Sequence, residues 1–472
     1  MKKIFASIAI ALLVVGFNSC SEEFLELEPS FAISETDAFT SIDKARAVLI
    51  SAYNYNSYYT CHGLYFFVIP EVMGDDVYVK ASGNYNWFVH DYKLTTLDSY
   101  TRVLDVWEYF YKVIQATNQV IANVPGIVGD ENEKSSLMGQ AYGLRAMSYF
   151  NLVRLYCKDI SVDPQAAGVP LRITPANAGS EAPGRGTVQQ VYDQIVKDLD
   201  SAMVHAPVFT ESATFSLDAA HALAARVNLY LKNYPEAVTH ARAAYADHPL
   251  MSIDEMLAGL QEPNDEWIWS LEYTADDNTG YASLGSFYDN RILGYSSMRA
   301  DVDFLALIDV AVDLRRDWWE RSGGDWVLSQ DGGKFLKFPQ SSSQDQDVVM
   351  FRSTEMYLIE AEALAMQNLW TEAQDALWNI QQRAKPTTAK STNTGQSLID
   401  EILLERRIEM IGEGQRLFDL NRLNMPLHRG SSAWPEVIKD LPANDPLLIY
   451  PIPKDEIDAN PNISEAEQNE GY

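Results

Sequence analysis

The residues best suited to chemistry lie close together near the C-terminus, between positions 403 and 423. This stretch carries eight charged side chains: Glu405, Arg406, Arg407, Glu409, Glu413, Arg416, Asp419 and Arg422. Leu404, Ile408 and Ile411 recur among them at i, i+4 and i+7, which predicts a helix with an apolar stripe. Gly412 and Gly414 then predict that this helix ends or turns sharply.

The charged stretch has two interpretations. A carboxylate such as Glu405 or Glu413 could act as a general acid or base, because active sites gather perturbed carboxylates. The structural alternative is a set of partly buried ion pairs, since a planar guanidinium can hold a carboxylate at two points. We favour the structural interpretation, in which five residues lock the C-terminal helix to the rest of the scaffold. They are Glu405, Arg406, Arg407, Glu413 and Arg416.

The composition indicates a large, acidic, globular protein. The chain has 472 residues, 47% of them hydrophobic, which is enough for one large core or several smaller ones. The formal net charge of −30 argues against binding nucleic acid or anionic lipid by charge, and more weakly against polyanionic ligands. The 10 Trp and 25 Tyr supply amphipathic rings that suit neutral ligands rich in hydroxyl groups.

The first twenty residues predict a lipoprotein signal. Lys2 and Lys3 precede an almost wholly apolar run, residues 4–17, which is too short for a comfortable membrane span. Because Cys20 follows directly, we expect residues 1–19 to be removed and Cys20 to be lipidated, which anchors the chain to a membrane. An ordinary secretory peptide, cleaved nearby, is the alternative.

Signatures of catalysis and of metal binding are scarce. The chain contains no G-x-S-x-G, H-E-x-x-H, P-loop or EF-hand motif, and no CxxC or histidine cluster accompanies Cys61 and Cys157. We therefore predict no catalytic residue, no metal site and no cofactor. The two cysteines either pair or stay as buried thiols, and the sequence leaves this open. A glycosidase using two of the 66 carboxylates remains an alternative.

Apolar periodicity predicts a mostly α-helical chain. Four helices are expected at residues 41–55, 107–123, 133–156 and 188–202. Thr187 should cap the last of them. Residues 56–100 are expected to be irregular and are rich in aromatic side chains.

A helix–turn–helix pattern occurs twice. Residues 217–231 form the first helix of one unit, and residues 352–366 form the first helix of the other. Small alanines at the helix crossing and an aromatic residue at the turn resemble the tetratricopeptide hairpin. Such hairpins bury their apolar faces only against neighbours, so we expect about four pairs. The helical scaffold should cover about 40–247 and 351–425.

Residues 248–350 form an irregular, aromatic-rich insertion in this scaffold. Residues 266–272 predict a strand, on which Trp267 and Trp269 face one side and enter the core. Long irregular insertions in a regular scaffold often carry function.

Several motifs, in order along the chain, resemble the SusD/RagB family of surface glycan-binding lipoproteins from Bacteroidetes. Residues 352–363 match the pattern R-x-x-E-x-Y-L-I-x-A-E-A, and the charged stretch matches the C-terminal signature. Further matches lie at 168–171, 185–199, 451–461 and 468–472. Cys157 departs from the family pattern, which often has a glycine there.

The resemblance implies one SusD-like domain, residues 20–472, with tetratricopeptide-like hairpins wrapped by a loop-rich ligand-binding subdomain with a few short strands. It implies oligosaccharide binding without cleavage, at the cell surface, with a lipid anchor at Cys20 in the outer membrane. It also implies a partner, a SusC-like TonB-dependent barrel, over which the lipoprotein sits as a lid. Two alternatives stay open: a peptide-binding RagB-like lid and an all-α glycoside hydrolase.

Sugar binding of this kind needs aromatic faces that stack on pyranose rings, with polar groups for the hydroxyls. The leading platform is Trp87, in a segment that lies where the family's first binding loops lie. Asp75 and Asp76 either bind hydroxyls or cap a turn, and the cap is favoured. The other candidates are Tyr78, Asn84, Tyr85, Tyr281, Tyr288, Arg291, Tyr295 and Trp319.

Overall fold

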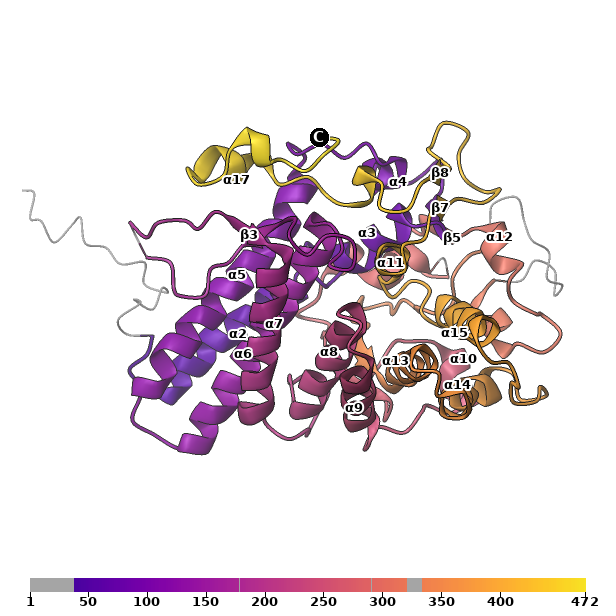
Figure 1. Ribbon diagram of the computed structural model, residues 1–472, viewed down its shortest axis with the longest axis horizontal. Coiled ribbons are helices and arrows are strands. Elements are labelled where there is room, and N and C mark those ends of the chain that lie inside the picture. Colours follow the sequence, from indigo (N-terminus) through magenta and orange to yellow (C-terminus); the bar gives the residue numbers. More distant parts are fainter. Residues whose placement is uncertain (1–37, 178, 290, 321–332) are drawn as a thin grey trace, which may run out of the picture.

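The computed structural model describes residues 38–177, 179–289, 291–320 and 333–472. The predicted signal peptide and Cys20 lie outside these ranges. The prediction of a mostly α-helical fold with a few short strands is confirmed. Helices pack against their neighbours from one end of the molecule to the other, while loops and short strands lie beside them (Figure 1).

Four long helices form the N-terminal part of the scaffold. They are α2 (Ile42–Ser57), α5 (Thr101–Asn123), α6 (Glu131–Tyr156) and α7 (Val188–His205). α2 packs on α5, α5 on α6 and α6 on α7, so each helix buries its apolar stripe against the next. The predicted cap of α7 is confirmed, since Thr187 Oγ1 accepts the backbone N–H of Gln190. In turn, Gln190 Oε1 accepts the backbone N–H of Thr187, which completes a capping box.

Two helical hairpins continue the scaffold. The first joins α8 (Leu217–Tyr230) to α9 (Tyr234–Tyr245), and the second joins α13 (Ser353–Met366) to α14 (Trp370–Ala384). α9 packs on α13, so the two hairpins are neighbours although the insertion separates them in sequence. Small residues let the helices approach closely, as Ala224 and Ala241 are both buried. The pairing of helices agrees with the prediction, whereas their tetratricopeptide character stays a prediction.

The C-terminal charged stretch forms two helices, α15 (Gln396–Glu409) and α16 (Arg416–Arg422). The predicted break is confirmed, because Gly412 and Gly414 between them both have positive φ angles, 80° and 72°. A side chain at Gly414 would also lie 2.8 Å from the carbonyl oxygen of Phe66. The chain then runs along the top of Figure 1 through β7 (Leu427–His428), β8 (Asp440–Leu441) and α17 (Lys454–Ala459).

The prediction that residues 56–100 are irregular is wrong in part. This region contains α3 (Tyr65–Met73), strand β1 (Val77–Val79) and α4 (Val89–Lys93). Every residue of α3 is buried, so the helix has no amphipathic period to detect, and Pro70 lies inside it. Glu71 on α3 accepts the backbone N–H groups of Gly412 and Gln415, which ties α3 to the turn before α16.

The insertion adds short elements beside the scaffold. These are α10 (Ile253–Ala258), β4 (Trp267–Leu271), α11 (Leu284–Tyr288), β5 (Met298–Ala300), α12 (Val302–Leu305) and β6 (Val348–Arg352). β4 pairs antiparallel with β6, which leads directly into α13, and a separate pair joins β2 (Ala167–Pro170) to β3 (Arg185–Thr187). Trp267 and Trp269 are buried, as predicted.

Candidate functional site

A two-stranded antiparallel ladder joins the two regions from which ligand-binding loops were expected. β1 pairs with β5 in the register Val79↔Met298, and the N–H of Lys80 donates to the carbonyl of Ser297 at 2.9 Å. The loop after β1 and the loop before β5 therefore leave the ladder at the same end. This pairing brings Trp87 and Tyr295, 208 positions apart in sequence, to the same place.

Four aromatic side chains gather at this end of the ladder and form what we call the aromatic platform: Tyr85, Trp87, Tyr281 and Tyr295. The ring centroid of Tyr295 lies 5.4 Å from that of Tyr85, 5.6 Å from Trp87 and 6.4 Å from Tyr281. Tyr85 is 75% exposed and Tyr281 49% exposed, while Trp87 and Tyr295 are half-buried. Both exposed rings meet Tyr295 edge to face, with planes 73° and 74° apart, so the platform offers aromatic faces at steep angles to one another.

The platform rests on a rigid aromatic floor. Trp87 packs against Tyr59, Tyr65, Phe88 and Phe287, with centroid separations of 5.3 to 6.5 Å. The guanidinium of Arg102 lies beneath it, 5.7 Å from the Trp87 ring. Aromatic pairs at such separations contribute roughly 0.5–1.5 kcal/mol each beyond their burial.

Arg102 is held in this floor by an ion pair with Asp91, whose carboxylate also accepts a hydrogen bond. Arg102 Nη1 donates to Asp91 Oδ2 at 2.6 Å, and the hydroxyl of Tyr450 donates to the same carboxylate. Asp91 belongs to α4, directly after the platform loop, whereas Tyr450 belongs to the C-terminal segment. The floor is thus held by three parts of the chain.

The loop that carries Trp87 has an unusual backbone. Tyr85, Asn86 and Phe88 all have positive φ angles, 53°, 62° and 58°. Such angles cost free energy in residues other than glycine and persist only where the surroundings enforce them. Asn84 does so here, since its Nδ2 donates to the carbonyl of Lys80 and its Oδ1 accepts the N–H of Asn86, both at 2.9 Å. Asn84 therefore shapes the loop and is not itself presented to a ligand.

Three aromatic candidates lie in the core. Tyr78 on β1, Tyr288 on α11 and Trp319 are each no more than 6% exposed. Tyr288 packs on Phe335 and Phe338, and Trp319 packs on Phe335, so neither ring has a face left for a ligand. Because all three side chains are buried, they are not expected to contact a ligand. The sequence did not reveal this, since the glycine and aspartate residues around them do not indicate which rings turn inward.

The acidic candidates Asp75 and Asp76 are occupied by arginines of the charged stretch. Arg416 Nε lies 2.6 Å from Asp75 Oδ1, and Arg407 donates to both oxygens of Asp76. Neither the hydroxyl-binding role nor the favoured turn cap describes them. Arg291, in the loop before β5, donates to Asp289. Its side chain is 49% exposed, so part of the guanidinium remains accessible to a ligand.

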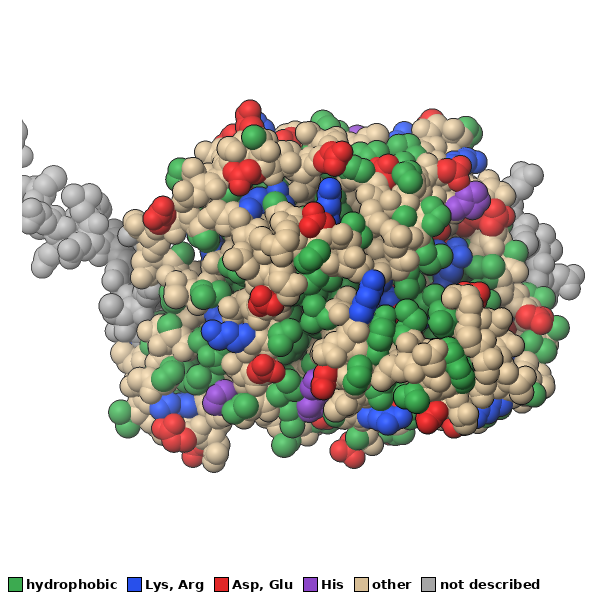
Figure 2. Space-filling view, viewed as in Figure 1, with side chains coloured by type: hydrophobic (Ala, Val, Ile, Leu, Met, Phe, Trp, Pro, Cys, Tyr) green, Lys and Arg blue, Asp and Glu red, His purple; other side chains and the backbone are tan. Residues whose placement is uncertain are grey.

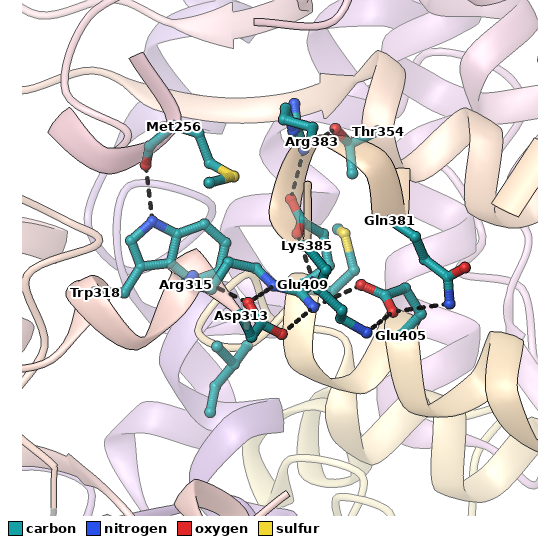
Figure 3. A network of polar contacts seen from close by, with 12 residues as sticks. Met256, Asp313, Arg315, Trp318, Thr354, Gln381, Arg383, Lys385, Glu405 and Glu409 are labelled. Carbon is teal, nitrogen blue, oxygen red and sulfur yellow. Dashed lines mark hydrogen bonds and ion pairs between the residues drawn. The ribbon is translucent and has the colours of Figure 1, made fainter. Parts of the chain in front are cut away.

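The charged stretch forms the predicted buried ion-pair network (Figure 3). Glu409 on α15 contacts three guanidinium groups, from Arg315 at 2.9 Å, Arg383 at 3.0 Å and Arg352 at 3.1 Å. These cations hold the pKa of Glu409 well below its ordinary value. Glu405 pairs with Arg315 and with Lys385, both at 2.6 Å.

The same network joins the insertion to the scaffold. Arg315 comes from the insertion, Arg352 from the end of β6 and Arg383 from α14. Further along, Arg406 and Arg422 both donate to Asp419, and they lower the pKa of this carboxyl to about 2. An enclosed, fully paired carboxylate cannot exchange protons with a substrate, so the network supports architecture and not acid–base chemistry.

Cysteines and possible metal ligands add no further site in the described ranges. Cys61 and Cys157 are separate buried thiols, which answers the question the sequence left open, and burial raises the pKa of Cys157 to about 11. Among the described residues, no group of three or more His, Cys, Asp or Glu side chains is arranged to hold a metal ion.

Charged side chains on the face seen in Figure 2 and the helices of the described residues bear on whether the chain has a charged or membrane-spanning site. Acidic side chains are scattered over the visible face and do not gather in one patch (Figure 2). Across the part of the chain that the structure describes, no helix is long and apolar enough to cross a membrane.

The sequence analysis missed the residues under the platform, namely Tyr59, Tyr65, Phe88, Arg102 and Phe287. One signal was available, because the segment from Tyr53 to Tyr65 contains five tyrosines in thirteen residues. Their partners lie in α5 and in the insertion, which periodicity alone cannot connect.

Two family profiles match the chain. The profile of the SusD family matches residues 334–472, and one described as "Starch-binding associating with outer membrane" matches residues 23–229. The chain is also 25% identical to SusD-like protein P38 from Formosa agariphila, in an alignment that covers 90% of this chain and 92% of that protein.

Solved structures share the fold over nearly the whole described chain. A SusD superfamily protein from Bacteroides thetaiotaomicron aligns with a TM-score of 0.83 and 26% identity. The alignment covers 91% of this chain and 99% of that protein. A putative sugar binding protein from Bacteroides vulgatus aligns with a TM-score of 0.82 and 24% identity, covering 92% and 99%. The second likeness concerns the fold alone.

Proposed function

Because the chain belongs to the SusD family, we propose that it binds an oligosaccharide on the aromatic platform and delivers it to a SusC-like TonB-dependent barrel in the outer membrane. In this proposal the mature chain is anchored at the cell surface by lipid on Cys20, and it binds its ligand without cleaving it.

The observation that carries the binding proposal is the juxtaposition of Trp87, Tyr295 and two exposed tyrosines at one end of the β1–β5 ladder. Aromatic faces suit the apolar C–H faces of pyranose rings, and a neutral ligand suits a chain with a net charge of −30. Arg291, half-exposed on the loop before β5, uses Nε and Nη2 to hold Asp289 and has further N–H donors that could reach hydroxyl groups.

The rigid floor supports the same proposal. A binding surface that is ordered before the ligand arrives loses less conformational entropy on binding. The loop held by Asn84 and the cation of Arg102 under Trp87 meet this requirement.

A glycan panel tests the proposal. The protein is run through native gels that contain neutral polysaccharides, and each glycan is checked afterwards for new reducing ends. We expect retardation by at least one glycan without any new reducing ends. Release of reducing ends by pure protein would contradict the non-catalytic part, and retardation by none of the glycans would contradict the binding part.

Replacement of the platform residue locates the site. Trp87→Ala should abolish retardation while the circular dichroism spectrum stays that of the folded protein. The matched control is Trp370→Ala, because Trp370 is also half-buried but starts α14, in the hairpin α13–α14. Unchanged retardation of the Trp87 variant would place the site elsewhere.

A further inference from the structure

A groove with a volume of about 800 Å³ lies beside the aromatic platform. One wall is a single face of α2, and the other consists of residues 207–214 and 270–279. Its volume is in the upper part of the range for pockets that enclose small-molecule ligands, roughly 300–1,000 Å³. The groove therefore has room for more than one sugar ring.

Both walls of this groove run into the platform. Thr279 lies on the groove, and the short helix η3 (Gly280–Ala282), which carries Tyr281, follows it directly. On the opposite wall, Tyr58 contacts Tyr59 with ring centroids 4.7 Å apart, and Tyr59 contacts Trp87 at 6.5 Å. These two connections place the groove next to the platform, through Thr279 on one wall and Tyr58 on the other.

The groove is built to keep its shape. The hydroxyl of Tyr273 donates to the carbonyl of Ser57 at 2.6 Å, which joins the two walls. Tyr53 Oη donates to Gln140 Oε1 at 2.8 Å and accepts the N–H of Phe215 at 3.0 Å, which fixes the floor between α2 and α6.

The groove offers both kinds of group that a sugar chain needs. Tyr58 lines the groove, is 43% exposed and is held in place by stacking on Tyr109, with centroids 4.9 Å apart and planes 6° from parallel. The side chains of Asn54 and Thr210 are exposed and make no hydrogen bond to other residues within the described ranges.

The charges of the groove are acidic. Glu211, Glu272 and Asp277 line it, and Arg46, the basic residue among the described lining residues, is already paired with Glu133 at 3.1 Å. A carboxylate or sulfate on the ligand would therefore be repelled, since like charges raise the free energy of binding.

We propose that this groove binds the continuation of the glycan chain that starts on the platform, and that the ligand is an uncharged oligosaccharide longer than the platform alone can hold. The inference rests on the proposed function, because it takes the platform as the first part of the same site.

Chain length provides the first test. Neutral oligosaccharides of increasing length, from the glycan that retards the wild-type protein, are titrated into the full chain by calorimetry. We expect affinity to rise with length beyond the shortest chain that binds. The double variant Asn54→Ala/Thr210→Ala should weaken the longest chains by about tenfold, the equivalent of one or two lost hydrogen bonds, and leave the shortest unchanged. Both substitutions are at exposed positions, so the variant should fold.

Three outcomes separate the hypotheses. Equal affinity for short and long chains, or no effect of the double variant on long chains, would overturn the groove proposal while the Trp87→Ala result still supports the platform. A second contradicting result would be that the wild-type protein binds unstructured peptides, and that the double variant weakens peptide binding but not glycan binding. Failure of every glycan to bind would overturn the proposed function itself.

Ligand charge provides the second test. Oligosaccharides of equal length that carry uronate or sulfate groups should bind at least about tenfold more weakly than the neutral chain. Glu272→Gln should narrow this gap, because the amide keeps an oxygen that can accept from Ser212, which lies 2.9 Å from Glu272 Oε1, while it removes one negative charge. Equal binding of charged and neutral chains by the wild-type protein would contradict the inference.

Discussion

The guanidinium of Arg407 and the carboxylate of Asp76 are joined by three hydrogen bonds of 2.5 to 3.0 Å, although 331 positions separate them in the chain. Asp76 directly precedes β1, the strand from which the platform loop leaves. Helix α15 therefore holds the base of the candidate binding site. Through this ion pair with Asp76, the charged stretch helps to fix the position of the β1–β5 ladder that carries the platform loops.

Removal of this contact should affect stability before it affects affinity. Arg407→Ala leaves Asp76, whose side chain is 2% exposed, with Arg416 as its remaining cation. We expect the free energy of unfolding to fall by about 2 kcal/mol, the cost of losing hydrogen bonds to a buried charge. Urea unfolding measures this change.

A matched control and a contradicting result are available. Lys454→Ala removes an exposed i,i+4 pair with Asp458 and should change stability by less than about 0.5 kcal/mol. An Arg407 variant with wild-type stability but no glycan binding would show that Arg407 belongs to the binding surface itself.

The second prediction concerns the shape of the platform loop. Asn84→Ala removes both side-chain hydrogen bonds that hold the strained backbone, so the loop should relax and Trp87 should lose its fixed position. We expect glycan affinity to drop by about tenfold, with stability changed by about 1–2 kcal/mol. Asn86→Gly is the informative comparison, because glycine accepts positive φ without strain and should retain binding. Full affinity in the Asn84 variant would refute its positioning role.

The third prediction concerns the buried network around Glu409. Glu409→Gln places an amide N–H₂ group against three arginines and should destabilise the fold by more than about 3 kcal/mol. Glu372→Gln, at an exposed position on α14, is the control and should be nearly neutral. A soluble, fully stable Glu409 variant would show that the network is not required for folding.

The network also determines acid stability. Because the pKa of Glu409 is depressed in the folded chain, its contribution is present above the unfolded value of 4.5 and is lost as the pH falls through the lower folded value. The pKa of Asp419, lowered to about 2, adds a loss between 3.8 and 2. Unfolding midpoints measured from pH 5 to pH 2 should therefore decline, and a flat profile would argue against ionised pairs.

The fourth prediction has the opposite pH dependence. Burial and the neighbouring Glu272, Glu262 and Asp345 carboxylates raise the pKa of Asp347 from 3.8 to about 7. The folded chain then binds a proton more tightly than the unfolded chain. This stabilisation is full below pH 3.8 and is lost as the pH rises through about 7.

The variant Asp347→Asn isolates this effect. Asparagine keeps an acceptor for the N–H of Tyr273, which lies 2.7 Å from Asp347 Oδ1. The variant should be more stable than the wild type at pH 8, and this gain should be smaller at pH 5 and absent below pH 3.8. The gain should stay below about 1 kcal/mol, since Asp347 is only half-buried and solvent screens its neighbours. Thermal unfolding at the two pH values measures the difference, and a gain that is the same at both would exclude titration as its cause.

Sequence patterns predicted the elements whose signal is local. Thr187 and Gln190 form a capping box within four residues, and Gly412 and Gly414 break a helix wherever they occur in such a run. The amphipathic helices were predicted for the same reason, because each shows its apolar stripe in its own residues. Helix α3 was missed because its residues are all buried and so carry no contrast between two faces.

The residues of the candidate site could be predicted only in part. The sequence by itself determined the fold class, the family signature and the candidate status of Trp87, Tyr85, Tyr281 and Tyr295, since these depend on residue type and local order. It could not separate these rings from Tyr288 and Trp319, which have similar local surroundings but lie in the core. Only the tertiary structure decided that, because the β1–β5 register, fixed by backbone hydrogen bonds between strands over two hundred residues apart, determines which rings meet at the surface and which are covered.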